Sequence, residues 1–481
     1  MQPLIGSAGA CGRSTSRLPP PKVHSEGVKS ETGDVSTSKD GTLGAWFGRS
    51  GIRRLPHFAG RWCVYTTTDQ PARTGRLQRE LARSTQPACA EGVETLSAKH
   101  VTVPISPELL VWARTSIAKD TAVAAKSAGV PTQRLLAWEA GSEQPSLPQL
   151  EALSRAYKRP LAAFFLATPP TEVAPPADFR TLPEGERSDL SEPTILALRR
   201  ARQVQELAEE LAESVDFDAP ELRFDIDRRD PEETAARLRV LLGWTGSELR
   251  GWGDRYAALR GRIAAVEALG IIVLQMAMPV AETRGFSLTD GPLSIIAVST
   301  KDQPEARSFS LLHELVHVVG HAGGLCDMRV GSARRSAPGA PLEVFCNHVA
   351  GAALVPRDDM LAHPVVLDHG GREEWSDDEL RSLSRTYRVS REVVLRRLLT
   401  LERTTDSFYQ RMRSVWKRRT PDTSGFGADK PAEVIRRNGL LFLGMVLEGL
   451  HTGALSLSAA ADYLATKPKH VRGVERLVMH R

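Results

Sequence analysis

The sequence predicts a mainly α protein with a small β-sheet (α+β), and three observations carry this prediction. Short amphipathic helical patterns run from Ile105 to Leu166 and return from about residue 376 onward. Two short apolar runs, 271–276 and 293–299, are typical of buried strands. A helical pattern at 305–320 follows the second run. We therefore expect an all-α N-terminal domain, a central α+β domain and a C-terminal helical region.

The remaining elements are placed by their start and stop signals. The Pro-rich stretch 167–185 is a connector, and the helical pattern of 191–215 begins at Ser191 with Pro193 in its first turn. Other helices are expected at 231–242, after Asp230; at 256–268, before Gly270; at 342–354, ended by Pro356; at 376–401, with a turn at Val389-Ser390; and over 431–477.

Composition limits the class of protein. With 481 residues, 41% hydrophobic and 25% charged, the chain is long enough for several domains of ordinary globular type. No apolar run reaches the roughly 18 residues of a membrane span, so we expect no membrane association. Five scattered cysteines without a CxxC pair predict neither a disulfide framework nor a cysteine zinc site, and they favour a cytoplasmic location.

The stretch AKSAGVPTQRLLAWEAG, which starts at Ala125, has the spacing of a helix-turn-helix. Such a motif needs a small residue where two helices cross and a glycine with positive φ in the turn, and Ala125 and Gly129 meet both needs. Val130, Leu135 and Trp138 are expected to hold the second helix against the core. The basic excess of the chain lies in this N-terminal third, as a nucleic-acid surface requires.

Three polar side chains fall at the N-terminal end of this second helix: Thr132, Gln133 and Arg134. That end of a recognition helix enters the major groove, where Gln pairs with adenine and Arg with guanine. Glu139 is expected to hold the turn that follows. We therefore predict binding to double-stranded operator DNA, as a homodimer because the positive charge of this segment is modest.

The stretch FSLLHELVHVVGH contains a His-Glu-x-x-His motif. On a helix, His313 and His317 lie four residues apart on one face, so both imidazoles can bind one metal ion. Glu314 lies beside them, where it can take a proton from a metal-bound water that attacks a carbonyl carbon. The motif predicts metal-dependent peptide hydrolysis with Glu314 as the general base.

Zinc needs a third protein ligand, for which the sequence offers several candidates. His321 lies about 12 Å along the helix from the first histidine, so it could bind only if the helix breaks at Gly320. Asp327 lies in the following loop. Glu343 is better placed, because it opens the next helix, and Asn347 lies one turn further on the same face, where it can support a metal ligand without binding the metal itself. Zinc suits a tetrahedral His/His/Glu set, and manganese also accepts these ligands.

Two known families resemble parts of the chain. About 60 residues resemble the Xre/Cro-repressor-like family, through Arg114, Ala125, Gly129, Val130, Trp138, Glu139, Gly141, Pro145, Ser146 and Leu150. The motifs LGIIV (269–273), RGFS (284–287), LSIIAVS (293–299), RSFSLLHELVH (307–317) and EVFCNHVAGAALVP (343–356) resemble the ImmA/IrrE-type metallopeptidases. DFRT (178–181) resembles the linker that joins such domains.

The second resemblance implies a zincin-like domain in which His313, His317 and Glu343 hold zinc and Glu314 is the general base. It also implies regulated cleavage of a repressor. This chain departs from the family pattern at Cys346 and His348, where alanine and a bulky apolar residue are commoner, and at 297–299, where the family often has a terminal asparagine. Neither departure removes a ligand.

The predicted organisation has five segments. Residues 1–98 are expected to be disordered or to lie upstream of the true translation start; 99–168 form the helix-turn-helix domain, 169–255 the connector and helical linker, 256–365 the HExxH metallopeptidase domain, and 366–481 the C-terminal helical region. The predicted function is a DNA-binding regulator whose zinc endopeptidase cleaves a repressor or itself. The alternative is a non-enzymatic repressor or antitoxin that binds its own promoter and a partner toxin.

Overall fold

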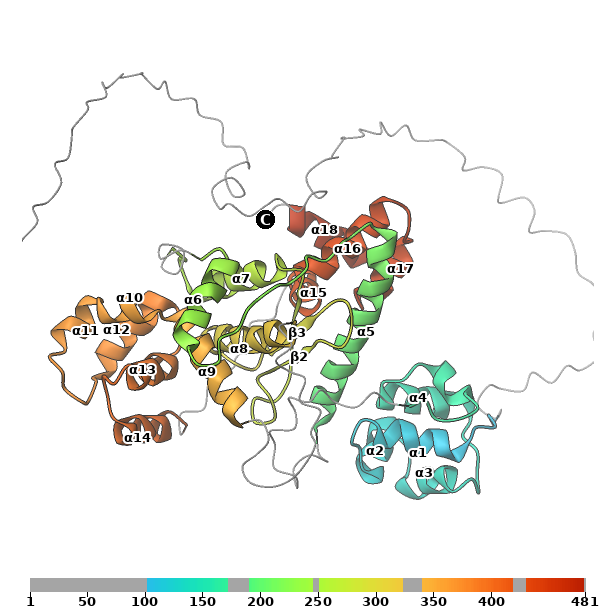
Figure 1. Cartoon of the computed structure of the whole chain (residues 1–481). Helices are drawn as coiled ribbons and strands as arrows, with labels where there is room; N and C mark the ends of the chain where they lie inside the picture. Colours follow the sequence, from blue (N-terminus) through green and yellow to red (C-terminus); the bar gives the residue numbers. More distant parts are fainter. Residues whose placement is uncertain (1–101, 172–189, 245–250, 323–339, 418–429, 480–481) are drawn as a thin grey trace, which may run out of the picture. The chain divides into compact units, whose positions relative to one another are not determined.

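The computed structural model describes residues 102–171, 190–244, 251–322, 340–417 and 430–479 (Figure 1). The predictions for residues 1–98 and for most of the Pro-rich connector lie outside these ranges. Within them the chain is mainly helical with one small mixed sheet, which confirms the α+β class. No described helix is both long and apolar enough to cross a membrane.

The first group of helices builds a small core of its own around Leu110, Leu135 and Trp138. It consists of α1 (Pro107–Thr115), α2 (Thr121–Ala128), α3 (Thr132–Glu139), α4 (Leu147–Tyr157) and a 3-10 turn (Leu161–Phe165). The Asp120 side chain accepts a hydrogen bond from the Val123 amide at the start of α2. Gly129 ends α2 with φ at +69°, a conformation that favours glycine, and the chain turns directly into α3.

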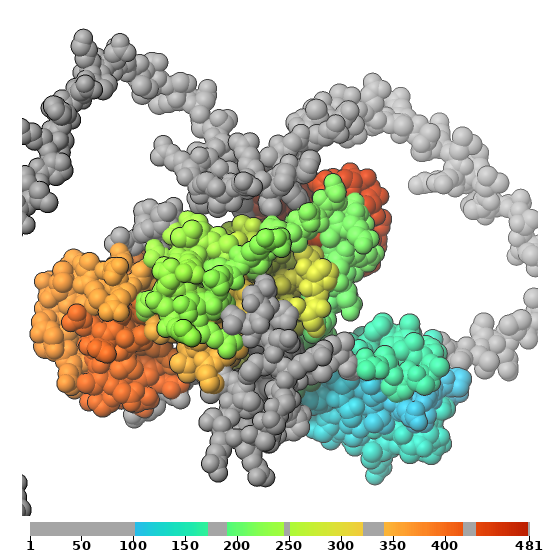
Figure 2. Space-filling view, viewed as in Figure 1, coloured from blue at the N-terminus to red at the C-terminus, as the bar shows by residue number. Residues whose placement is uncertain are grey.

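The central elements comprise a three-stranded sheet and the helices around it. They are α5 (Glu192–Ser214), α6 (Pro231–Leu241), α7 (Arg255–Glu267), β1 (Ile272–Met276), β2 (Gly285–Leu288), β3 (Ile295–Ser299), α8 (Pro304–Ala322) and α9 (Ala340–Leu354). The strand order is β1-β3-β2, with β1 parallel and β2 antiparallel to β3. In Figure 2 the segment that holds α6 and α7, in light green, forms the surface over the middle of this group.

Strand β2 was not among the predicted strands. Its four residues are too few to show an alternating pattern, and the sequence marked them only as part of a family motif. They become a strand because they pair with β3, where Phe286 lies opposite Ala297 and Ser287 opposite Ile296. Tertiary pairing, not local pattern, therefore determines this element.

The two faces of the sheet belong to different cores, because side chains alternate along a strand. Val273, Ile296 and Val298 pack with Leu311 and Leu315 of α8. Residues of the opposite face pack with α5 and α16: Ile272, Leu274, Met276, Phe286, Leu288, Ile295 and Ala297. Helix α8 is thus fastened to one face through its leucines, which leaves the histidine face of the same helix turned toward α9.

The C-terminal helices divide between these two cores. The first set contributes to the core that contains α8 and α9: α10 (Arg357–Leu361), α11 (Pro364–Asp368), α12 (Asp377–Tyr387), α13 (Arg391–Thr400) and α14 (Asp406–Lys417). The second set shares the core of α5 and the other sheet face: α15 (Lys430–Asn438), α16 (Leu440–His451), α17 (Leu457–Tyr463) and α18 (Pro468–Met479).

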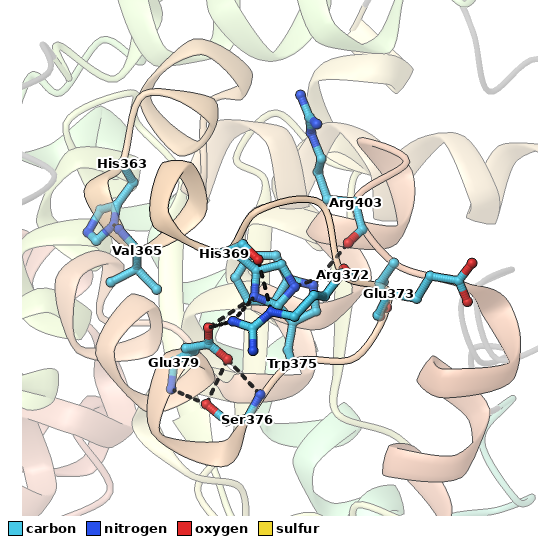
Figure 3. A network of polar contacts seen from close by, with 10 residues as sticks. His363, Val365, His369, Arg372, Glu373, Trp375, Ser376, Glu379 and Arg403 are labelled. Carbon is cyan, nitrogen blue, oxygen red and sulfur yellow. Dashed lines mark hydrogen bonds and ion pairs between the residues drawn. The ribbon is translucent and has the colours of Figure 1, made fainter.

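A polar network holds the turn between α11 and α12 (Figure 3). The His369 ring stacks on Trp375 with centroids 3.5 Å apart, and its Nδ1 lies 3.0 Å from a Glu379 oxygen. Its Nε2 lies 2.8 Å from the Arg372 carbonyl oxygen. Although burial raises the pKa of Glu379, hydrogen bonds from His369 and Ser376 lower it to about 2. We interpret this network as structural, because its groups satisfy one another and cap α12.

A buried carboxyl group joins the α7 end to α16. Glu267 Oε1 accepts a hydrogen bond from the Leu441 amide at 3.2 Å, in the first turn of α16, where free amides favour an acceptor. Gly439 precedes this turn with φ at +74°, and a Cβ there would lie 2.6 Å from Glu267 Oε1. Burial raises the pKa of Glu267 to about 7, although the backbone hydrogen bonds oppose the shift.

This raised pKa predicts a loss of stability with rising pH. Between pH 4.5 and about 7 the Glu267 carboxyl ionises in the unfolded chain but stays protonated in the folded one, so the free energy of unfolding falls across that window. The contribution is on the order of 3 kcal/mol. Glu267→Gln should remove this part of the pH dependence in urea titrations, whereas Glu206→Gln on exposed α5 surface should retain it. Equal slopes in all three proteins would contradict the assignment.

Candidate metal centre

Helix α8 places two imidazoles side by side. His313 Nε2 and His317 Nε2 are 3.2 Å apart, as expected for residues four positions apart on one helix face. The His317 side chain is 6% exposed and that of His313 is 15% exposed. The site is therefore largely shielded, yet one imidazole still reaches solvent.

Helix α9 brings a carboxylate to the same point. Glu343 Oε2 lies 3.2 Å from His313 Nε2, and Glu343 Oε1 lies 3.3 Å from His317 Nε2. One ligand atom from each of the three residues lies within 4.8 Å of the others. Two atoms bound to a tetrahedral zinc at 2.0–2.1 Å lie roughly 3.3–3.4 Å apart. The separation of the two imidazole nitrogens, and that of each nitrogen from its nearer Glu343 oxygen, is close to this spacing, so the three side chains are placed to hold a single metal ion.

The Glu343 carboxylate and the His317 imidazole shift each other's pKa values toward the charged forms. Burial alone would raise the pKa of Glu343, but the two imidazoles hold it well below its usual range. Burial lowers the pKa of His317, yet contacts with Cys346 and Glu343 raise it overall. Protons therefore compete with a metal ion for these nitrogens, and metal affinity should fall with falling pH.

Glu314 lies between the two histidines in sequence and is buried, with 6% of its surface exposed. Its Oε2 accepts a hydrogen bond from Ser287 Oγ at 3.1 Å. The predicted site thus has a contact with β2 that the sequence analysis missed. Only the recognition of β2 as a strand could have indicated it, because Gly285 and Ser287 then share one face.

Cys346 is the second residue that the sequence analysis missed. Its side chain is fully buried and forms a hydrogen-bonding contact with His317. The spacing of three residues from Glu343 along α9 could have indicated this, because such residues lie on one helix face. Cys346, which departs from the family pattern, is therefore a neighbour of the candidate ligand His317.

The other candidates are placed as follows. Asn347 lies one turn beyond Glu343 on α9 and is partly buried; its role in supporting a metal ligand stays a prediction. The His321 side chain and Asp327 lie outside the described part of the chain. His348 is bonded away from the cluster, with Nε2 2.7 Å from Glu232 Oε1.

The three DNA-binding candidates form the first turn of α3. Thr132, Gln133 and Arg134 are all exposed, and Arg134 lies 3.6 Å from Glu143. The expectation for Glu139 was wrong. Its carboxylate accepts two hydrogen bonds from Arg114, at 2.7 and 3.0 Å, and so joins α3 to α1 instead of holding the turn after α3. The guanidinium group is the stronger partner because its two donors match the two carboxylate oxygens in a partly buried contact.

Comparison with known proteins yields one family match. Residues 266–399 match the model of a peptidase family described as the IrrE N-terminal-like domain. The matched range contains the whole sheet, the His313–His317–Glu343 cluster and Glu314. It covers a minority of the chain. A search of curated proteins found no match.

Proposed function

We propose that this chain is a DNA-binding transcriptional regulator that carries a zinc-dependent endopeptidase, which cleaves a repressor or the chain itself. The observation that carries the proposal is the spacing of the three donor groups of His313, His317 and Glu343. The match to a peptidase family over the same residues supports it. Zinc is the expected metal because the ligand set is small and of mixed nitrogen and oxygen type.

In this proposal His313, His317 and Glu343 hold the metal, and Glu314 performs the proton transfers. When bound there, zinc would supply the Lewis acidity that peptide hydrolysis needs. Glu314 would take a proton from the attacking water and deliver it to the leaving amine nitrogen. Because Glu314 is buried beside the ligands, competing bulk water is largely kept away from its carboxylate.

The edge position of β2 in the described sheet favours an extended protein segment as the substrate. Strand β2 is at one edge of the described sheet and contacts α8. An extended segment can add to such an edge through main-chain hydrogen bonds, which would bring its peptide groups near the metal cluster. A repressor segment, or a segment of this chain, meets that requirement.

The proposed operator contacts come from Thr132, Gln133 and Arg134. We expect Gln133→Ala and Arg134→Ala each to weaken specific binding by roughly 1–3 kcal/mol, because each removes a base-edge contact. Arg155→Ala is the matched control, since it removes the same charge from exposed surface of α4. Gel-shift titrations at fixed salt measure the effect. Equal affinities for wild type and the two α3 variants would reject the assignment.

The decisive experiment follows DNA occupancy and chain length together. The purified protein is placed on its own upstream DNA, one equivalent of zinc is added, and both quantities are recorded with time. Loss of occupancy that coincides with a fragment supports a self-cleaving regulator. Bound DNA with an intact chain directs the search to a partner repressor, and failure to bind zinc refutes the peptidase and favours a non-enzymatic repressor or antitoxin.

A further inference from the structure

We infer that strand β2 positions the general base: Ser287 holds the Glu314 carboxylate by a hydrogen bond, and Gly285 leaves the space that this side chain occupies. The inference rests on the proposed peptidase function, and it goes beyond it by assigning roles to two residues outside the HExxH motif. Both act through Glu314, so they are positioning residues and not catalytic ones.

The hydrogen bond joins two buried groups. Ser287 is 5% exposed and Glu314 is 6% exposed, and Ser287 Oγ donates to Glu314 Oε2 at 3.1 Å. A carboxylate removed from water needs donors inside the protein, so this contact both satisfies the charge and selects one side-chain orientation. The helix alone cannot do this, because it directs the Cα–Cβ bond of Glu314 but leaves its further rotations open.

Gly285 provides the second constraint. A Cβ at this position would lie 3.2 Å from Glu314 Cγ, 3.4 Å from Glu314 Oε1 and 2.9 Å from the Ala297 carbonyl oxygen. The last distance is shorter than such contacts tolerate, and its partner is backbone. Any side chain at 285 would therefore push β2 away from β3 or push Glu314 out of its place.

The register of the sheet places both residues on the face toward α8. Gly285 lies opposite Val298 and Ser287 opposite Ile296, and these two β3 residues share the core with α8. Phe286 belongs to the core on the other face. A slip of one residue would turn an apolar side chain toward Glu314, so the pairing with β3 determines what the general base meets.

The test compares Ser287→Ala, Ser287→Thr and Gly285→Ala in the zinc-loaded full chain. Cleavage is followed on fluorescein-labelled casein and on the chain itself, and zinc affinity is measured by competition with a chromophoric chelator. We expect Ser287→Ala to lower kcat about 10- to 100-fold with KM and zinc affinity unchanged, because a small misplacement of a catalytic group has this effect. Ser287→Thr, which keeps the hydroxyl group, should restore most of the rate.

A second readout does not depend on activity. Thermal midpoints are measured for Ser287→Ala, Glu314→Ala and the double variant. If the two side chains act on each other, the midpoint shift caused by Ser287→Ala in the wild type should shrink in the Glu314→Ala background. Additive shifts would overturn the inference, as would an unchanged kcat for Ser287→Ala.

The proposed peptidase function and the positioning role of Ser287 can fail separately. If the wild type binds zinc but cuts neither casein nor itself, self-cleavage is rejected and a partner repressor is the remaining substrate of the proposed function; the thermal cycle alone then decides the contact between Ser287 and Glu314. If the wild type cuts and Ser287→Ala cuts equally well, the proposed function stands and the positioning role is overturned. Should Gly285→Ala fail to fold, the two Ser287 variants still give the result.

Discussion

Glu314→Gln is expected to leave zinc bound and the chain folded while cleavage nearly stops. Glutamine keeps the size of the side chain and can still accept the hydrogen bond from Ser287 Oγ, which is 3.1 Å away in the wild type. It cannot take a proton from water. Loss of a general base typically lowers the rate by 10²- to 10⁴-fold, and we expect an effect of about this size on kcat.

The measurement is the rate of fragment formation at saturating zinc, with zinc content determined on the same samples. Asp358→Asn is the control, because it makes a comparable change of charge on an exposed turn of α10. DNA affinity should be equal in all three proteins. Cleavage that survives in Glu314→Gln would refute the proposed mechanism, whereas equal inactivity in zinc-loaded wild type and variant would reject self-cleavage and direct the measurement to a partner repressor.

Glu343→Ala is expected to remove most of the zinc affinity. The substitution deletes a carboxylate whose two oxygens lie 3.2 Å from His313 Nε2 and 3.3 Å from His317 Nε2, and it leaves a two-histidine site. Changes in the outer shell of metal sites cost 10- to 100-fold in affinity, so the loss of a direct ligand should exceed about 100-fold. Cleavage should disappear at zinc concentrations that saturate the wild type.

Chelator competition measures the affinity, and Val344→Ala is the matched control. Val344 is the next residue of α9 and is 68% exposed, so its truncation alters the same helix without touching the cluster. Full zinc affinity in Glu343→Ala would show that the third ligand is another group, and Asp327→Ala would then be the variant to measure. Loss of affinity in both Glu343→Ala and Val344→Ala would indicate damage to α9 itself.

Two of the three described strands follow from the local sequence pattern, whereas β2 and the Arg114–Glu139 pair do not. The strands at 271–276 and 293–299 were predictable because both are continuous apolar runs that are buried on two faces. Strand β2 was not, because its formation depends on pairing with β3. The Arg114–Glu139 pair was also missed, since the two residues are 25 positions apart and nothing local indicates that α1 and α3 meet there.

By itself the sequence determined that His313 and His317 lie side by side with Glu314 next to them, because residues four positions apart lie on one face of a helix. It also determined the turn at Gly129, which needs a residue that tolerates positive φ. Only the tertiary structure decided that Glu343 meets both histidines and that β2 meets Glu314. Those contacts join elements far apart along the chain, and packing of the two cores on either side of the sheet brings them together.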